Sequence, residues 1–240
     1  MIYWDFLKKY SIDVYCICLI DRNDKFIKVS NEFDKVGLLP MVKFHRPVKN
    51  KNTGLGCFLS HKFCMQNSNN NVLVFEDDVK FTNDWQEKLL HIKAFLENEP
   101  NYNILRLGCF LTSIHESPDN TDKVCLSKSY MTHALIYSTE YKNKLLKNPT
   151  FDGQIQIDDY LHDESCKDFA LVNPICYQRI INNTSDNVWQ STRVQLIMQR
   201  PYIYENIQWL ANIYISGIRC LPVHIQEKVN LWYLMYKIFR

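Results

Sequence analysis

Three consecutive carboxylates, Glu76, Asp77 and Asp78, are the side chains of this sequence best suited to chemistry. They directly follow the apolar run of residues 72–75, which is typical of a buried strand, so they are expected on a loop at its end. Adjacent carboxylates repel one another unless a positive charge shares the site. Mg²⁺ and Mn²⁺ bind through one or two carboxylates together with substrate phosphates. The triplet therefore predicts a metal site, against the alternative of a solvated acidic turn that caps the next helix.

A second acidic pair, Asp158 and Asp159, follows about 80 residues further along the chain. It could oppose the triplet across a cleft, where one of the two carboxylates would serve as a general base toward an acceptor hydroxyl. The alternative is a helix N-terminus, at which aspartates stabilise the helix dipole. Both interpretations stay open from the sequence alone.

Two further segments could contact a phosphorylated ligand. Asp21 and Arg22 end the apolar run of residues 12–20, and an arginine there could hold a phosphate, although a surface ion pair is the alternative. Residues 54–56, GLG, lack the spacing of a P-loop or a dinucleotide fingerprint, so both are rejected. Ser60 and His61 follow on the same predicted helix, where a lone histidine is usually a hydrogen-bonded core residue.

The elements that must position these residues alternate between strand and helix. Apolar runs predict strands at residues 12–20, 72–75, 104–107, 124–126, 134–137 and 170–172. Helices are expected at residues 53–65, after Ser138 as N-cap, and where an apolar face is formed by Trp85, Leu89, Ile92 and Leu96. Such alternation predicts an α/β fold, in which ligands bind at strand ends.

Composition narrows the class of protein. The 240 residues are 46% hydrophobic and 22% charged, which suits one globular domain with a sizeable core. The 28 basic and 26 acidic residues form no block of like charge, which argues against a nucleic-acid partner. The nine cysteines include no Cys-x-x-Cys pair, so buried free thiols are expected rather than structural zinc or disulfides.

The two ends of the chain carry weaker signals. The N-terminal residues lack the features of a signal peptide, and no apolar run is long enough to span a bilayer, so a cytoplasmic, reducing location is expected. The last 50 residues are aromatic and mildly basic and are expected to be helical. They could pack on the core, mediate a homodimer or rest on a membrane surface.

Taken in order, these motifs resemble the family 25 glycosyltransferases, which include lipooligosaccharide galactosyltransferases and the transferase domains of collagen galactosyltransferases. The most specific segment is residues 54–61, GLGCFLSH, which is close to the family's Gly-Glu-x-Gly-Cys-x-x-Ser-His. The strand with its acidic triplet, the opening strand with Asp21 and Arg22, and residues 134–138 and 157–161 are similar to other family segments. The resemblance spans about residues 12–190.

The resemblance implies a GT-A fold, a Rossmann-like nucleotide-sugar-binding sheet flanked by helices, over residues 1–190, with a helical extension over residues 191–240 packed on it. It also implies a UDP-sugar donor, Mn²⁺ or Mg²⁺ as cofactor, and inversion at the anomeric carbon. Carried over by position, Glu76 and Asp78 would bind the metal and Asp158 or Asp159 would be the base. The donor would contact Asp21, Arg22, Ser60, His61 and Asp77.

The function expected from this resemblance is transfer of a hexose, galactose or glucose, to a glycan or to hydroxylysine in a collagen-like protein. One alternative is an inactive family member that serves as a sugar-binding or assembly module. Another is a metal-dependent nucleotide hydrolase, against which the motifs argue. The sugar and the acceptor depend on a few pocket contacts in loops and cannot be read from the motifs.

Overall fold

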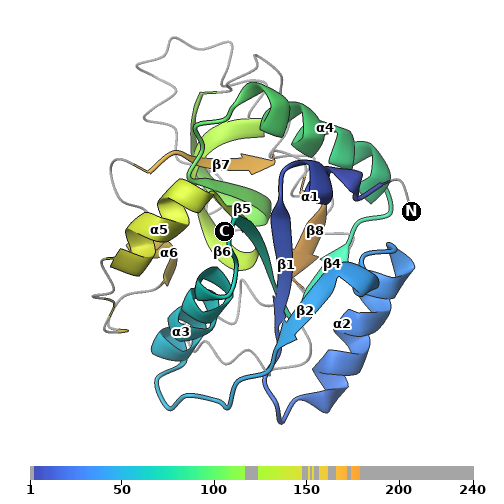
Figure 1. Cartoon of the computed structure of the whole chain (residues 1–240), viewed down its shortest axis with the longest axis vertical. Helices are drawn as coiled ribbons and strands as arrows, with labels where there is room; N and C mark the ends of the chain where they lie inside the picture. Colours follow the sequence, from blue (N-terminus) through green and yellow to red (C-terminus); the bar gives the residue numbers. More distant parts are fainter. Residues whose placement is uncertain are drawn as a thin grey trace, which may run out of the picture.

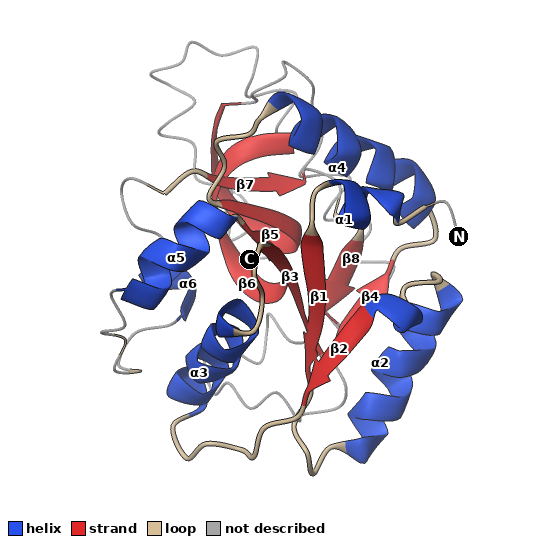
Figure 2. Ribbon diagram, in the orientation of Figure 1, coloured by secondary structure: helices blue, strands red, loops and turns tan. Residues whose placement is uncertain are grey.

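The computed structural model describes residues 3–116, 124–147, 151, 153, 157–161, 166–171 and 174–178. Within them a central sheet is covered by helices on two faces (Figures 1 and 2). The predicted extension over residues 191–240 lies outside the described residues, and so do its proposed contacts. No helix in the described part of the chain combines the length and apolar character that crossing a bilayer requires.

The central sheet has six strands in the order β2-β1-β3-β6-β5-β7. Their bounds are β1 Ile12–Ile17, β2 Val42–His45, β3 Asn71–Glu76, β5 Ile104–Glu116, β6 Val124–Tyr137 and β7 Asp168–Leu171. β1 is parallel to β2 and β3, β5 is parallel to β7, and β6 is antiparallel to its neighbours. Only β6 therefore runs against the others, which confirms the predicted α/β class with a Rossmann-like sheet.

The helices divide between the two faces because side chains along a strand point alternately to opposite sides. One face carries α1 (Asp5–Lys9), α2 (Asn23–Lys35) and α4 (Trp85–Asn98), whose apolar residues pack with Leu73 and Phe75 of β3. The other carries α3 (Thr53–Gln66), α5 (Thr139–Lys147) and α6 (Ile157–Leu161), which pack with Val72 and Val74. A short 3₁₀ turn, Leu39–Met41, precedes β2.

Several predicted elements are confirmed with their caps. The helix expected after residue 53 is α3, and the Asn52 side chain accepts a hydrogen bond from the Leu55 N–H at its start. Ser138 caps α5, since its Oγ accepts from the Tyr141 N–H at 3.2 Å. The four apolar residues predicted for one helix face are all buried on α4.

One strand of the sheet and one helix differ from the prediction. Residues 124–126 and 134–137, expected as separate strands, belong to the single strand β6, which pairs with an equally extended β5. The hairpin curls so that the first residues of β6 also pair with β7. At Gly108 a Cβ would meet His133 Nε2 at 2.3 Å, so only glycine lets the two strands approach there. Helix α2 was not predicted.

A second, small sheet pairs β4 (Val79–Phe81) with β8 (Cys176–Gln178) and begins directly after the acidic triplet. The seven cysteines whose side chains are described are all free, and five of them are buried. The prediction of buried free thiols is confirmed for this part of the chain.

Candidate active site

The acidic triplet lies at the carboxyl end of the central parallel strands. Glu76 is the last residue of β3, and it pairs in register with Ile17, the last residue of β1. Asp77 and Asp78 form the turn that leads into β4. The predicted position on a strand-end loop is confirmed, and it is the edge of an α/β sheet where ligands bind.

The three carboxylates of the triplet turn to different partners. Glu76 accepts a hydrogen bond from the Thr132 hydroxyl of β6. Asp77 accepts one from Lys25 Nζ at 2.9 Å, which brings the first turn of α2 to the triplet. Asp78 Oδ2 accepts one from Gln178 Nε2 of β8 at 2.8 Å. Three separate elements therefore meet at this loop.

Of the three carboxylates, Asp78 has the negative charge that neighbouring groups offset least. Burial, and secondly the charge of Glu76, raise the pKa of Asp78 to about 7. Burial also raises the pKa of Asp77, against the opposing effect of Lys25. Burial acts in the same sense on Glu76, but hydrogen bonds and the charge of His61 outweigh it and lower its pKa. The site thus confines more negative charge than its neighbours neutralise.

The residues present fit a divalent cation. Asp78 Oδ1 is buried and accepts no hydrogen bond from any described residue, which leaves one hard oxygen ligand unused. The adjoining Glu76 and Asp77 offer further oxygen atoms of the kind that Mg²⁺ and Mn²⁺ prefer. A cation at this loop would offset the repulsion that raises the pKa of Asp78.

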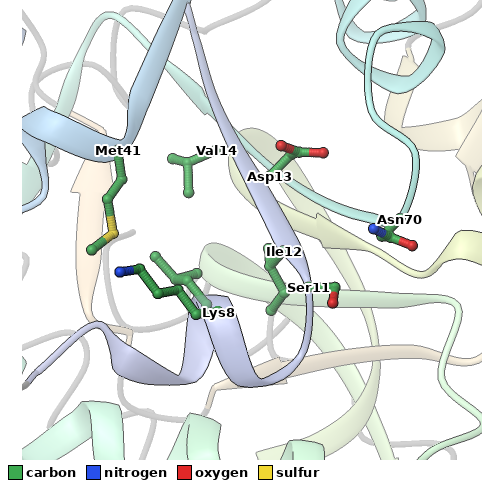
Figure 3. A pocket seen from close by; sticks show the side chains of 8 residues that line it. Lys8, Ser11, Ile12, Asp13, Val14, Met41 and Asn70 are labelled. Atoms are coloured by element: carbon green, nitrogen blue, oxygen red, sulfur yellow. The ribbon is translucent and has the colours of Figure 1, made fainter.

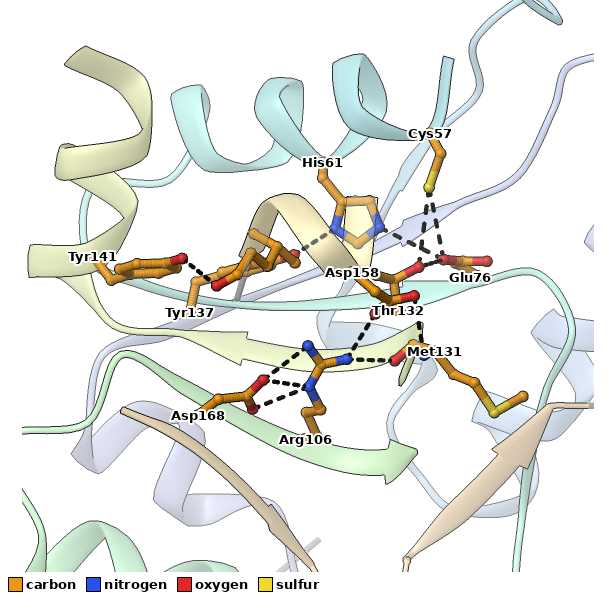
Figure 4. Close-up of polar contacts among 11 residues, drawn as sticks. Cys57, His61, Glu76, Arg106, Met131, Thr132, Tyr137, Tyr141, Asp158 and Asp168 are labelled. Atoms are coloured by element: carbon orange, nitrogen blue, oxygen red, sulfur yellow. Dashed lines mark hydrogen bonds and ion pairs between the residues drawn. The ribbon is translucent and has the colours of Figure 1, made fainter. Parts of the chain in front are cut away.

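Behind Glu76 lies a chain of polar side chains that reaches into the core (Figure 4). His61 Nε2 lies 3.6 Å from Glu76 Oε1, and its Nδ1 is 3.0 Å from the Tyr137 hydroxyl. His61 is fully buried. The expectation of a hydrogen-bonded core histidine is therefore confirmed, and its nearest carboxylate belongs to the triplet.

The second acidic cluster is built around a buried arginine that was not predicted as a site residue. Arg106 of β5 is 0% exposed and binds Asp158 through Nη1 at 2.9 Å. Its Nε lies 3.0 and 2.9 Å from the two oxygens of Asp168. Burial raises the pKa of Asp168 to about 6, although Arg106 opposes this. The signal in the sequence was a single charged residue within an otherwise apolar strand.

Met131 links this arginine to Asp158. Its carbonyl accepts from Arg106 Nη1 at 3.0 Å and its N–H donates to Asp158 Oδ2 at 3.1 Å. It adopts a φ of +88°, a region that non-glycine residues rarely occupy. The next residue, Thr132, binds Glu76. Two adjacent residues of β6 thereby bring Asp158 and Glu76 into one neighbourhood.

The remaining predicted site residues, Asp21, Arg22, Ser60 and Asp159, lie on three different elements. Asp21 is exposed on the loop between β1 and α2, and Arg22, the N-cap of α2, lies 3.2 Å from Asp24. Ser60 donates its hydroxyl to the Gly56 carbonyl within α3 at 2.8 Å, so this group is engaged with its own helix. Asp159 belongs to α6, and its side chain lies outside what the structure describes.

A family model described as glycosyltransferase family 25, LPS biosynthesis protein, matches residues 45–166, just over half of the chain. The chain belongs to glycosyltransferase family 25. The matched segment contains the acidic triplet, the GLGCFLSH helix and the Arg106 cluster apart from Asp168. The glycosyltransferase family predicted from the motifs is confirmed. No curated protein matches the sequence.

Solved structures give distant likenesses to this glycosyltransferase. A UDP-glucose pyrophosphorylase complexed with UDP-glucose has a TM-score of 0.43 and 12% identity, with 70% of this chain and 75% of that chain covered. The inositol-1-phosphate CTP transferase from T. maritima gives 0.41 and 16%, covering 80% and 78%. A putative glucose-1-phosphate thymidylyltransferase from Bacillus anthracis, in complex with a sucrose, gives 0.38 and 14%, covering 65% of each chain. The chain thus spans less than two thirds of that protein, and scores this low carry no argument about function.

A pocket of about 260 Å³ lies at the other end of the sheet (Figure 3). It is lined by residues at the amino end of β1, including Ile12 and Asp13, with Met41 and Asn70 beside them. Ile12 pairs with Asn71, the first residue of β3, whereas the triplet follows the last. The pocket is therefore separate from the candidate active site.

Proposed function

We propose that this glycosyltransferase transfers a hexose, galactose or glucose, from a UDP-sugar to a hydroxyl of a glycan or hydroxylysine-type acceptor, with inversion at the anomeric carbon. The observation that carries the proposal is the triplet at the end of β3, in which a buried Asp78 oxygen has no described partner within a chain of family 25. A carboxylate left in this way suits a cation that accompanies a diphosphate.

Glu76 and Asp78 would hold a divalent cation, Mn²⁺ or Mg²⁺. When bound, it would supply positive charge toward the leaving diphosphate. Asp77 orients Lys25, whose ammonium lies 2.9 Å from it at the start of α2. Together with Arg22, this cation at a helix N-terminus is suited to an anionic donor.

The base would take the proton of the acceptor hydroxyl while its oxygen attacks the anomeric carbon and the bond to the diphosphate breaks. Both oxygens of Asp158 are engaged, one with Arg106 and one with the Met131 N–H. Those contacts favour a positioning role for Asp158. The proposal therefore assigns the base to Asp159 and predicts that Asp159→Asn lowers kcat by about 10²–10⁴-fold.

The test is UDP release from a panel of UDP-sugars with Mn²⁺, with and without EDTA, because slow donor hydrolysis needs no known acceptor. Release from one sugar that stops on chelation supports the proposal and names the donor. If no UDP-sugar releases UDP while Mn²⁺-dependent UDP binding is intact, a sugar-binding module would be favoured instead. Release that no glycan or hydroxylysine peptide accelerates would favour a hydrolase.

A matched pair of variants ties the activity to the triplet. Asp78→Ala is expected to abolish Mn²⁺-dependent UDP binding, measured by calorimetry. Asp84→Ala is the control. Asp84 lies outside the triplet, just before α4, and its Oδ1 is 2.8 Å from Lys88 Nζ one helical turn further on. Unchanged Mn²⁺-dependent UDP affinity in Asp78→Ala would overturn the metal assignment.

A further inference from the structure

A cluster of three different ligand types lies at Glu76. Cys57, His61 and Glu76 each offer one atom, and these atoms all lie within 4.8 Å of one another. Cys57 and His61 are four residues apart, so they share one face of α3, and Glu76 reaches them from the end of β3. Thiol, imidazole and carboxylate converge on one point from two elements (Figure 4).

The separations are close to those of a filled tetrahedral site. Zinc bonds of about 2.3 Å to sulfur and about 2.0–2.2 Å to nitrogen and oxygen place ligand atoms about 3.3–3.7 Å apart. His61 Nε2 already lies 3.6 Å from Glu76 Oε1, and Cys57 Sγ lies 4.0 Å from the same oxygen. A shift of a few tenths of an ångström in Cys57 Sγ would bring its distance from Glu76 Oε1 into the same range.

His61 supplies the independent sign of a ligand. Its ring is 0% exposed, and Nε2 has no hydrogen-bond partner among the described residues although it points at the cluster. Its other nitrogen is 3.0 Å from the Tyr137 hydroxyl. A histidine that binds a metal through one nitrogen commonly has the other fixed by such a partner. The ring is thus held with Nε2 facing a thiol and a carboxylate, beyond hydrogen-bond distance of Glu76 Oε1 at 3.6 Å.

We propose that Cys57, His61 and Glu76 form a second cation site, which takes a zinc-class ion rather than Mg²⁺ or Mn²⁺. Sulfur and imidazole ligands favour Zn²⁺, whereas oxygen sets favour the harder ions. Three protein ligands leave a fourth position open, and Glu76 keeps 24% of its side chain exposed, which provides access. The absence of Cys-x-x-Cys pairs does not exclude this site, because a helical Cys-x-x-x-His pair supplies two ligands without that spacing.

The proposed site would share Glu76 with the triplet but is tested without any sugar donor. The chain freed of metal is titrated with Co²⁺ in excess Mg²⁺, and the thiolate-to-cobalt charge-transfer absorption is followed. One Co²⁺ per chain with this absorption, displaced by Zn²⁺, is expected. Because no donor is present, failure here would leave the proposed transferase activity untouched, and failure of UDP release would leave this site untouched.

Three variants assign the absorption to its ligands. Cys57→Ser is expected to remove it and to weaken Zn²⁺ binding by about 100-fold or more, since even losing a residue that only orients a ligand costs about 10–100-fold. Tyr137→Phe is expected to weaken binding about tenfold while keeping the absorption. Cys64→Ala, on the same helix but outside the cluster, is expected to behave as wild type. No thiolate absorption in the wild-type chain, or undiminished absorption in Cys57→Ser, would overturn the proposal.

Discussion

The two acidic clusters of this glycosyltransferase solve the same electrostatic problem in opposite ways. Around Arg106 the chain supplies its own cation, and the guanidinium satisfies two buried aspartates, Asp158 and Asp168. Around Asp78 it does not, because the nearest cation, Lys25, binds Asp77 instead. A buried carboxylate with an internal cation is a structural element, whereas one without a cation is suited to bind one from solution.

Removing the internal cation is expected to have the largest effect. Arg106→Met leaves Asp158 and Asp168 buried without the compensating guanidinium charge, which should cost about 3–5 kcal/mol of the free energy of unfolding. Urea denaturation in metal-free buffer measures this. Lys43→Met is the control, because its pair with Asp13 is exposed and should change stability by about 1 kcal/mol or less. Equal losses in the two variants would remove the distinction between buried and surface pairs.

Neutralising Asp78 in the other cluster is expected to increase the free energy of unfolding, whereas Arg106→Met decreases it. Asp78→Asn removes a carboxyl group whose pKa is raised from 3.8 to about 7, so the variant should be more stable than wild type at pH 8 without metal, by at most about 4 kcal/mol. The same urea denaturation measures it. Saturating Mn²⁺ should reverse the order, because only the wild type retains the full ligand set. A destabilised variant in metal-free buffer would show that the Asp78 charge is already compensated.

The difference in stability between wild type and Asp78→Asn is expected to depend on pH. Since the pKa of Asp78 is about 7 in the folded chain against an ordinary 3.8, the folded state binds more protons between these values. The stability of wild type therefore falls, relative to Asp78→Asn, as pH rises from about 4 to about 7, and the gap is constant above. Denaturation at several pH values measures it. A gap that does not change with pH would mean that another group sets the difference.

The smallest effect is expected from replacing Lys25, which binds Asp77 of the triplet. Lys25→Met removes the positive charge that Lys25 places on Asp77, so Mn²⁺ should bind about two- to tenfold more tightly when no nucleotide is present. Isothermal calorimetry measures this affinity, and Lys28→Met on the same helix serves as control. Weaker Mn²⁺ binding in Lys25→Met would indicate that the lysine holds Asp77 in place for the cation rather than competing with it.

The local pattern was sufficient to predict the elements that carry the triplet. A continuous apolar strand that ends in three carboxylates predicted the loop after β3, and the place of a lone histidine on the helix now seen as α3 predicted a buried His61. These features depend on neighbours in the sequence, where periodicity and burial act directly.

The contacts between distant elements could not be predicted in this way. Arg106 lies 52 and 62 residues from its two aspartates, and Lys25 lies 52 residues from Asp77. Helix α2 was missed because its apolar positions are few, with only Val29 and Phe33 buried. Strand β6 was divided in two because polar side chains interrupt its apolar run, whereas a hairpin partner pairs through the backbone regardless of side-chain type.

The separation in sequence between Arg106 and its aspartates also affects the order in which the sheet can form during translation. On the ribosome β5 emerges before α6 and β7, so for 62 residues of elongation the guanidinium has no Asp168 to bind. At about 5–20 residues per second this interval lasts about 3–12 s. Until then, burying β5 would enclose an isolated positive charge. The nascent chain can join β1, β2 and β3 early, but its sheet can close around β5 only after both aspartates have left the exit tunnel.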